Sequence, residues 1–159
     1  MKKNLLGYFK TTYVHIFWIA VLFDFLTKIW MASIEINQTV IEGFFYLHYS
    51  RNTGAAWSIL SGNQWILAMI SFTVGVSLFY YYLQRFTSFN KWNHLAINLF
   101  LAGTWGNFID RAFYSEGVID FLSFHFGQYI FPTFNFADSV LTIGVIILIV
   151  TSLFERPSK

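Results

Sequence analysis

The sequence predicts an all-α integral membrane protein with four transmembrane helices, and three observations lead to this fold class. Of the 159 residues, 56% are hydrophobic and only 11% are charged, whereas soluble domains carry about 25% charged residues. Aromatic residues make up 22% of the chain, which is typical of side chains at membrane interfaces. Four apolar stretches approach the roughly 20 residues that a membrane-spanning helix needs.

The predicted helices cover about residues 13–31, 65–83, 92–109 and 135–154. The first is interrupted by Asp24 and Lys28, and the second carries no charge. The third ends at Asp110 and Arg111 and contains small residues that suit close helix packing in lipid. The fourth has Asp138 in its first turn. With outer loops at about 32–64 and 110–134, these helices form a single integral membrane domain over 1–159.

The positions of Lys and Arg predict the orientation, because cytoplasmic segments are enriched in these residues. Seven of the ten lie at the two termini or between the second and third helices, whereas the other two loops contain only Arg51 and Arg111. Both termini are therefore expected in the cytoplasm and the two longer loops outside. The first of these loops could form short strands over 33–49. The second is rich in aromatic residues and is expected to lie on the membrane surface.

Composition also excludes several kinds of chemistry. The chain has no cysteine, which excludes disulfides and a thiolate nucleophile. The four histidines lack the spacing of a helix-borne zinc site, so no metal and no cofactor is expected. The net charge of +2 is spread out, and without a basic block nucleic acid is not an expected partner.

The four aspartates fall in or beside the outer halves of the membrane segments: Asp24, Asp110, Asp120 and Asp138. A charge at the centre of a membrane helix costs about 2.5–3.5 kcal/mol, so such residues are usually paired or functional. Asp24 and Lys28 lie four residues apart, in the order that favours an ion pair, and we interpret both as structural support, with direct catalysis as the alternative. Arg111 should keep the neighbouring Asp110 ionised, so Asp110 is also interpreted as structural.

Two groups of polar residues are candidates for substrate binding. Asn107 and Arg111 are four residues apart on one helix face and could orient the carbonyl groups of a ligand, or could simply terminate the helix. Asn52 can donate and accept hydrogen bonds, and Gly54 lets a partner backbone approach closely. An ordinary turn is the alternative for this second group.

Asp120 and Asp138 have no Lys or Arg close to them in the sequence. Asp138 could serve as a helix cap, although Asn135 is the better placed N-cap and would free Asp138 for other work. Two carboxyl groups brought together share a proton, because both cannot ionise. The ionised group could then take a proton from water while the protonated group polarises a peptide carbonyl. The residues alone leave a structural and a functional role open.

Five motifs, in this order, resemble those of the lipoprotein signal peptidases, also called prolipoprotein signal peptidases or signal peptidase II. They are DFLTK at 24–28, NTGAA at 52–56, GNFIDR at 106–111, VIDF at 118–121 and FNFAD at 134–138. Each motif is weak by itself, but five in order on a chain of four predicted helices are specific. One departure is Trp57, which stands where we expect Phe.

The resemblance implies an aspartic endopeptidase of the prokaryotic cytoplasmic membrane, with its active site near the extracytoplasmic face. It would cleave diacylglyceryl-modified prolipoproteins immediately before the lipidated cysteine, and globomycin-type peptides would block it. The outer loops would form a small β cradle on the membrane and a flexible aromatic lid. The expected catalytic residues are Asp120 and Asp138. The expected substrate-binding residues are Asn52, Gly54, Asn107, Arg111 and Asn135, supported by Asp24, Lys28 and Asp110.

Two other function classes remain as alternatives. A small ion or proton transporter would place titratable groups through the full depth of the membrane, whereas here they cluster in the outer half. A non-enzymatic assembly partner would leave Asp120 and Asp138 unexplained.

Overall fold

The computed structural model describes residues 2–55 and 59–154. Ala56 and Trp57, as well as Arg156 and Lys159 near the C-terminus, lie outside the described residues, so the sequence-based statements about them stay untested. The elements, in order, are α1 (Lys2–Phe9), α2 (Thr12–Ser33), β1 (Asn37–Ile41), β2 (Phe45–Asn52), α3 (Gln64–Gln84), the 3-10 helix η2 (Phe86–Ser88), α4 (Lys91–Phe113), β3 (Val118–Phe126), β4 (Tyr129–Ile130) and α5 (Phe136–Phe154).

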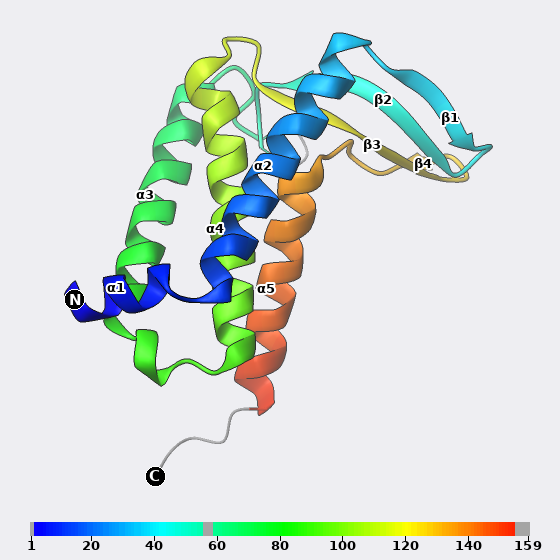
Figure 1. Cartoon of the computed structure of the whole chain (residues 1–159). Coiled ribbons are helices and arrows are strands. Elements are labelled where there is room, and N and C mark those ends of the chain that lie inside the picture. The colour runs from blue at the N-terminus through cyan, green and yellow to red at the C-terminus, as the bar shows by residue number, and fades with distance from the viewer. Residues whose placement is uncertain (1, 56–58, 155–159) are drawn as a thin grey trace.

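Four long helices, α2 to α5, stand side by side, with the sheet at one end and α1 at the other (Figure 1). Their positions agree with the sequence prediction to within a few residues, with two differences. The short helix α1 was not predicted; it is held by Tyr8, whose hydroxyl donates to Asn98 Oδ1 at 2.9 Å. The predicted end of the third helix at Asp110 is wrong, because α4 continues to Phe113 and the Tyr114 N–H closes its last turn on the Asp110 carbonyl.

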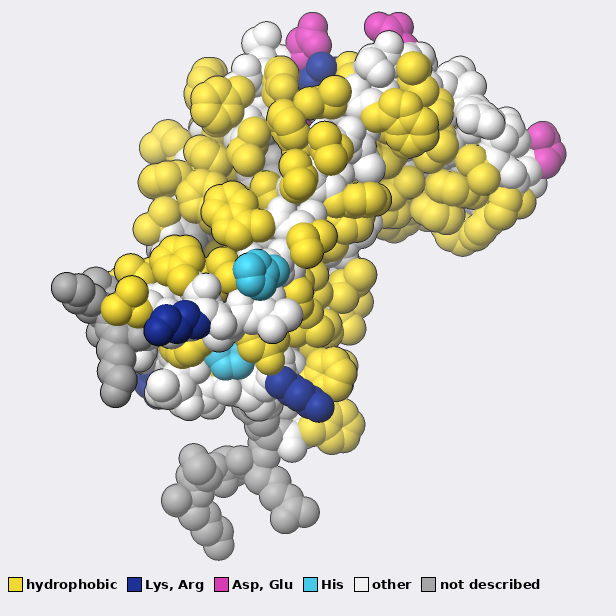
Figure 2. Space-filling model, in the orientation of Figure 1, with side chains coloured by type: hydrophobic (Ala, Val, Ile, Leu, Met, Phe, Trp, Pro, Cys, Tyr) yellow, Lys and Arg dark blue, Asp and Glu magenta, His cyan; other side chains and the backbone are white. Residues whose placement is uncertain are grey.

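Three of these helices, α2, α3 and α5, are long and apolar enough to cross a membrane. Helix α4 is equally long, at 23 residues, but more polar. It lies at the centre of the bundle and packs against all three other long helices, so most of its polar side chains are buried by protein. Apolar side chains cover much of the outer surface of the helices (Figure 2), as expected where helices face lipid rather than water.

Close packing of α4 on α5 depends on glycine at two positions. A Cβ atom at Gly103 would collide with the Ala137 carbonyl oxygen and lie 2.7 Å from Leu141 Cβ. A Cβ atom at Gly144 would lie 2.7 Å from the Ala96 carbonyl oxygen. Small residues at such contacts let helix backbones approach in lipid, and here they bring the first turn of α5 against α4.

The strands form one antiparallel four-stranded sheet in the order β1-β2-β3-β4. Strands β1 and β2 confirm the strand-forming potential of 33–49. The description of 110–134 as an aromatic surface loop is wrong over most of β3, because this strand pairs with β2 and its first four residues are buried. This pairing sets Asp120 opposite Ser50 and Val118 opposite Asn52, which brings two distant sequence motifs together.

Candidate active site

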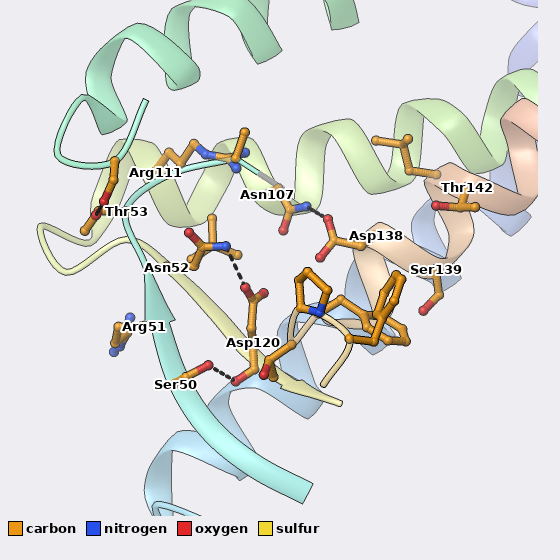
Figure 3. Close-up of a pocket in the computed structure, with 18 of the residues that line it drawn as sticks. Ser50, Arg51, Asn52, Thr53, Asn107, Arg111, Asp120, Asp138, Ser139 and Thr142 are labelled. Atoms are coloured by element: carbon orange, nitrogen blue, oxygen red, sulfur yellow. Dashed lines mark hydrogen bonds between the residues drawn. The ribbon is translucent and has the colours of Figure 1, made fainter. Parts of the chain in front are cut away.

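A cavity of about 1130 Å³ lies where the sheet meets the ends of α4 and α5 (Figure 3). Its walls come from β2, β3, α4, α5 and the segment 131–134 that leads into α5. The predicted site residues Asn52, Asn107, Arg111, Asp120 and Asp138 all line it. Segments from distant parts of the sequence therefore meet at one place.

Strand β3 carries Asp120, which is 2% exposed. Its two carboxylate oxygens accept different hydrogen bonds: Asn52 Nδ2 donates to Oδ2 at 2.9 Å, and Asn135 Nδ2 donates to Oδ1 at 2.7 Å. Asn52 is itself fixed, because its Oδ1 accepts the N–H of Gly54 at 2.9 Å. The carboxyl group is thus held from two sides by amides rather than by cations.

The first turn of α5 carries Asp138. Asn107 Nδ2 donates to its Oδ1 at 2.7 Å, and the Asn135 N–H donates to its Oδ2 at 3.2 Å. Asn135 is the N-cap as predicted, since its Oδ1 accepts the Asp138 N–H at 2.9 Å. The two residues therefore form a reciprocal capping box. The expectation that Asn135 frees Asp138 from capping is wrong, because one carboxylate oxygen takes part in the cap.

Asn135 connects the two carboxyl groups. It is fully buried, and its Nδ2 lies within hydrogen-bond distance of Asp120 Oδ1, Asn107 Oδ1 and the Ile119 carbonyl oxygen. Its backbone N–H meets Asp138 at the same time. A single amide side chain thus fixes the position of β3 relative to the start of α5, and with it the position of Asp120 relative to Asp138.

A buried cluster around Lys28 also supports this arrangement. The ammonium group lies 2.8 Å from Asp24 Oδ2, 2.9 Å from Asp110 Oδ2 and 3.0 Å from Asn107 Oδ1. Three acceptors match its three N–H donors. Asp24 Oδ1 also accepts the N–H of Ala137 at 2.8 Å, so the cluster holds the first turn of α5 directly.

The predicted partner of Asp110 is wrong. Lys28 rather than Arg111 pairs with it, and Asp110 Oδ2 also lies 3.4 Å from the Ile119 N–H. Arg111 instead points toward the segment that follows β2, where its Nη2 donates to the Gly54 carbonyl oxygen at 3.3 Å. Its Nε is buried and finds no partner among the described residues. The Arg111 side chain also lines the cavity, so its guanidinium group lies where a ligand could approach.

The environment of Asp120 makes it a proton carrier near neutral pH. Burial, and after it the negative charge of Asp138, raise the pKa of this carboxyl group to about 7. Hydrogen bonds from Asn52 and Asn135 oppose the shift, because they favour the ionised form. Asp120 thus keeps its proton up to about pH 7, and together with Asp138 it can form an acid–base pair.

The cavity also contains residues that sequence reasoning missed. Ser139 and Thr142 lie one and four residues after Asp138 on α5 and line the cavity with it, so helical periodicity could have identified Thr142. Ser50 and Arg51 line it from β2, and their placement depends on strand pairing that no local signal revealed. No group of three metal-binding side chains occurs in the described parts of the chain.

Comparison with known proteins gives consistent results. A family model described as signal peptidase (SPase) II matches residues 16–154. The chain is 42% identical over 147 residues to the lipoprotein signal peptidase of Bacillus pumilus (strain SAFR-032), covering 90% of this chain and 93% of that protein. It is 39% identical over 155 residues to that of Staphylococcus aureus (strain MRSA252), covering 96% and 94%. A bacterial membrane enzyme determined by the in meso method superposes with a TM-score of 0.81 at 35% identity, covering 93% of both chains.

Apolar helices of membrane-spanning length and two carboxyl groups at one cavity define the class of protein as a membrane-embedded aspartic peptidase. The family follows from the extent of the matches. The chain belongs to the signal peptidase II family. The alternative of an ion or proton transporter finds no support in these relatives.

Proposed function

We propose that this enzyme removes the signal peptide from diacylglyceryl-modified prolipoproteins by cleaving before the lipidated cysteine. The relatives in Bacillus and Staphylococcus are named lipoprotein signal peptidases, which supports the substrate. The observation that carries the mechanism is the shared anchoring of Asp120 and Asp138 by Asn135 at the wall of one cavity. Globomycin-type peptides are expected to occupy the same cavity.

In the proposed reaction one carboxyl group acts as the acid and the other as the base. Asp120 holds the proton, because burial and the charge of Asp138 raise its pKa to about 7, and it donates a hydrogen bond to the scissile carbonyl. Asp138 takes a proton from the attacking water. The tetrahedral intermediate then collapses as a proton passes to the leaving amine. Asn52 and Asn107 keep the two carboxyl groups in position through the cycle.

Substrate carbonyls have one clear donor in the cavity. Arg111 Nε is buried without a partner in the described structure, while Nη2 fixes the guanidinium on Gly54. A buried donor that lacks an acceptor is costly, so a movement of the side chain that brings Nε to a peptide carbonyl would remove this cost. The structural support for the site comes from Asp24, Lys28 and Asp110.

The membrane orientation is part of the proposal. We infer that α4 crosses the membrane as well, because it lies between three helices that are long and apolar enough to span it. The sheet then lies at the outer surface with the carboxyl pair. Both termini are cytoplasmic, as the distribution of Lys and Arg predicts.

A cleavage assay tests the proposed function. The purified enzyme in lipid vesicles is given a prolipoprotein peptide with a diacylglyceryl cysteine, or the same peptide with an unmodified cysteine. Only the lipidated peptide should be cleaved, and mass spectrometry should show the lipidated cysteine at the new N-terminus. Cleavage at another bond, or equal cleavage of both peptides, would contradict the proposal.

The carboxyl pair is tested by Asp120→Asn and Asp138→Asn. Each should lower kcat by about 10²–10⁴-fold, the usual contribution of a positioned acid or base. The double variant should be no slower than either single one, because the two groups act as a unit. Glu42→Gln is the matched control, since Glu42 is an exposed carboxylate in the turn between β1 and β2. Near-normal turnover by either Asp variant would refute the assignment.

A further inference from the structure

A second, smaller recess of about 250 Å³ is also lined by Asp138. It lies in the groove between α3 and α5, with α4 as its floor. Asn107, Arg111, Asp138 and Leu141 line both this recess and the main cavity. The two spaces therefore meet at Asp138, and the recess leads away from it between the helices.

The recess follows one face of α4 into the bundle. Its floor is formed by Phe100, Thr104, Asn107 and Arg111, whose spacing of four, three and four residues is that of a single helix face. Asn107 and Phe100 are seven residues apart, which corresponds to about 10 Å along the helix. Phe100 lies near the middle of α4, so the recess runs from the site toward the apolar interior of the membrane.

The deeper part of the recess is suited to an apolar ligand. Ile70, Ser71 and Val74 of α3 form its wall, and Leu141 of α5 lies where the recess joins the main cavity. The Thr104 hydroxyl, on the floor, already donates to the Phe100 carbonyl oxygen at 2.8 Å. The polar groups that a peptide backbone would require line the larger cavity instead, among them Ser50, Thr53 and Thr142.

The size of the recess excludes a helical ligand. A helix with its side chains is about 10–12 Å wide, which a slot of about 250 Å³ cannot hold. An extended hydrocarbon chain is narrow enough. The recess also begins beside Asp138 and Arg111, where the bond next to the lipidated residue would be cleaved.

We propose that this recess binds an acyl chain of the diacylglyceryl group during cleavage. This inference rests on the proposed function, and it assigns the lipid and the peptide to two separate spaces that Asp138 lines. An acyl chain moves here from lipid rather than from water, so its transfer gains little hydrophobic free energy. Its effect is to orient the adjoining residue against the carboxyl pair, which changes kcat more than KM.

Filling the deep end of the recess tests the proposal. Val74→Trp should obstruct a long chain while leaving the site itself clear, because Val74 is at the far end from Asp138. Val76→Trp is the matched control: Val76 is on the same helix, is 45% exposed against 40% for Val74, and does not line the recess. Both are assayed with one precursor peptide carrying either dipalmitoyl or dibutyryl glycerol. Butyryl chains are too short to span the roughly 10 Å from Asn107 to Phe100.

Val74→Trp should lower kcat for the dipalmitoyl substrate by about 10- to 100-fold, the effect of misplacing the reacting bond by a small distance. The dibutyryl substrate should stay within about twofold of its rate with the unmodified enzyme, and Val76→Trp should change neither rate. If Val74→Trp does not fold, Val74→Phe should show the same selective loss.

Two results would overturn the inference. Val74→Trp could lower kcat equally for the dipalmitoyl and dibutyryl substrates, as expected if the groove holds peptide, or it could lower kcat for neither. Failure of the unmodified enzyme to cleave any lipidated precursor would refute the proposed function instead.

Discussion

At the scale of single residues, Asp120 links the structure to a pH dependence. Its carboxyl group has a pKa of about 7 because it is buried and faces the charge of Asp138. Above that pH it loses the proton that the reaction needs, so kcat/KM should fall on the alkaline side of a bell-shaped profile. Steady-state rates from pH 4 to 9 measure this profile. A flat profile would contradict the shared-proton mechanism.

The raised pKa of Asp120 also predicts how the stability of the folded protein changes with pH. The folded protein holds the Asp120 proton up to about pH 7, whereas the unfolded chain releases it near the ordinary value of 3.8. The stabilisation is therefore present at low pH and is lost as the pH rises toward 7. The melting temperature should fall over this range, and Asp120→Asn should make this fall smaller. An unchanged slope in the variant would argue against the shifted pKa.

Lys28 is the residue on which the support of the site depends most. Lys28→Met would leave the buried carboxylates of Asp24 and Asp110 without their cation. Removing one partner of a buried ion pair costs about 3–5 kcal/mol, so a large fall in melting temperature and a loss of cleavage are expected. Lys10→Met, at an exposed lysine, is the control and should change neither. Thermal unfolding in detergent measures both variants.

Sequence reasoning identified these residues but not all of their partners. The spacing of Asp24 and Lys28 within one helix was sufficient to predict their ion pair, which the structure confirms. The partner of Asp110 was mistaken because adjacency to Arg111 was the only signal available along the chain. Lys28 reaches Asp110 from another helix, and no local pattern encodes which helices pack together.

At the scale of elements, the long helices were predictable because each needs only a sufficiently long apolar stretch. Strand β3 was not predictable in this way. Its buried residues include Ile119 and Phe121, and an apolar aromatic segment is equally consistent with a loop on the membrane surface. Its identity depends on pairing with β2. The sequence therefore identified residues that line the cavity better than it predicted the sheet that holds Asp120.

The packing of α4 on α5 gives a prediction at the same scale. Gly103→Ala would place a Cβ atom against the Ala137 carbonyl oxygen, and Ala137 directly precedes Asp138. Both stability and kcat should therefore fall, by about 1–3 kcal/mol for the overpacking. Gly7→Ala in α1 is the control, because its Cβ would meet only Phe86, at an ordinary 3.4 Å. Parallel melting and cleavage assays compare the two. An unaffected Gly103→Ala enzyme would show that this contact does not position α5.

At the scale of the whole molecule, charge separates the two ends of the bundle. The exposed acidic residues of the described chain, Glu35, Glu42 and Glu116, lie at the sheet end, whereas Lys10, Arg85 and Lys91 lie at the α1 end. Figure 2 shows the acidic groups at the end of the molecule that carries the sheet, with one cationic group beside them, and further cationic groups at the end that carries α1. This asymmetry predicts a cytoplasmic α1 end, and we therefore expect the carboxyl pair on the outer side of the membrane.

Single cysteines can test this topology against a clean background, because the chain contains none. Glu42→Cys, in the turn between β1 and β2, should react with a membrane-impermeant maleimide in intact cells. Lys10→Cys and Arg85→Cys should react only after the membrane is opened, since α2 and α3, both long and apolar enough to cross a membrane, separate them from Glu42. The reverse labelling pattern would place the carboxyl pair in the cytoplasm, where a precursor with an exported lipidated cysteine could not reach it.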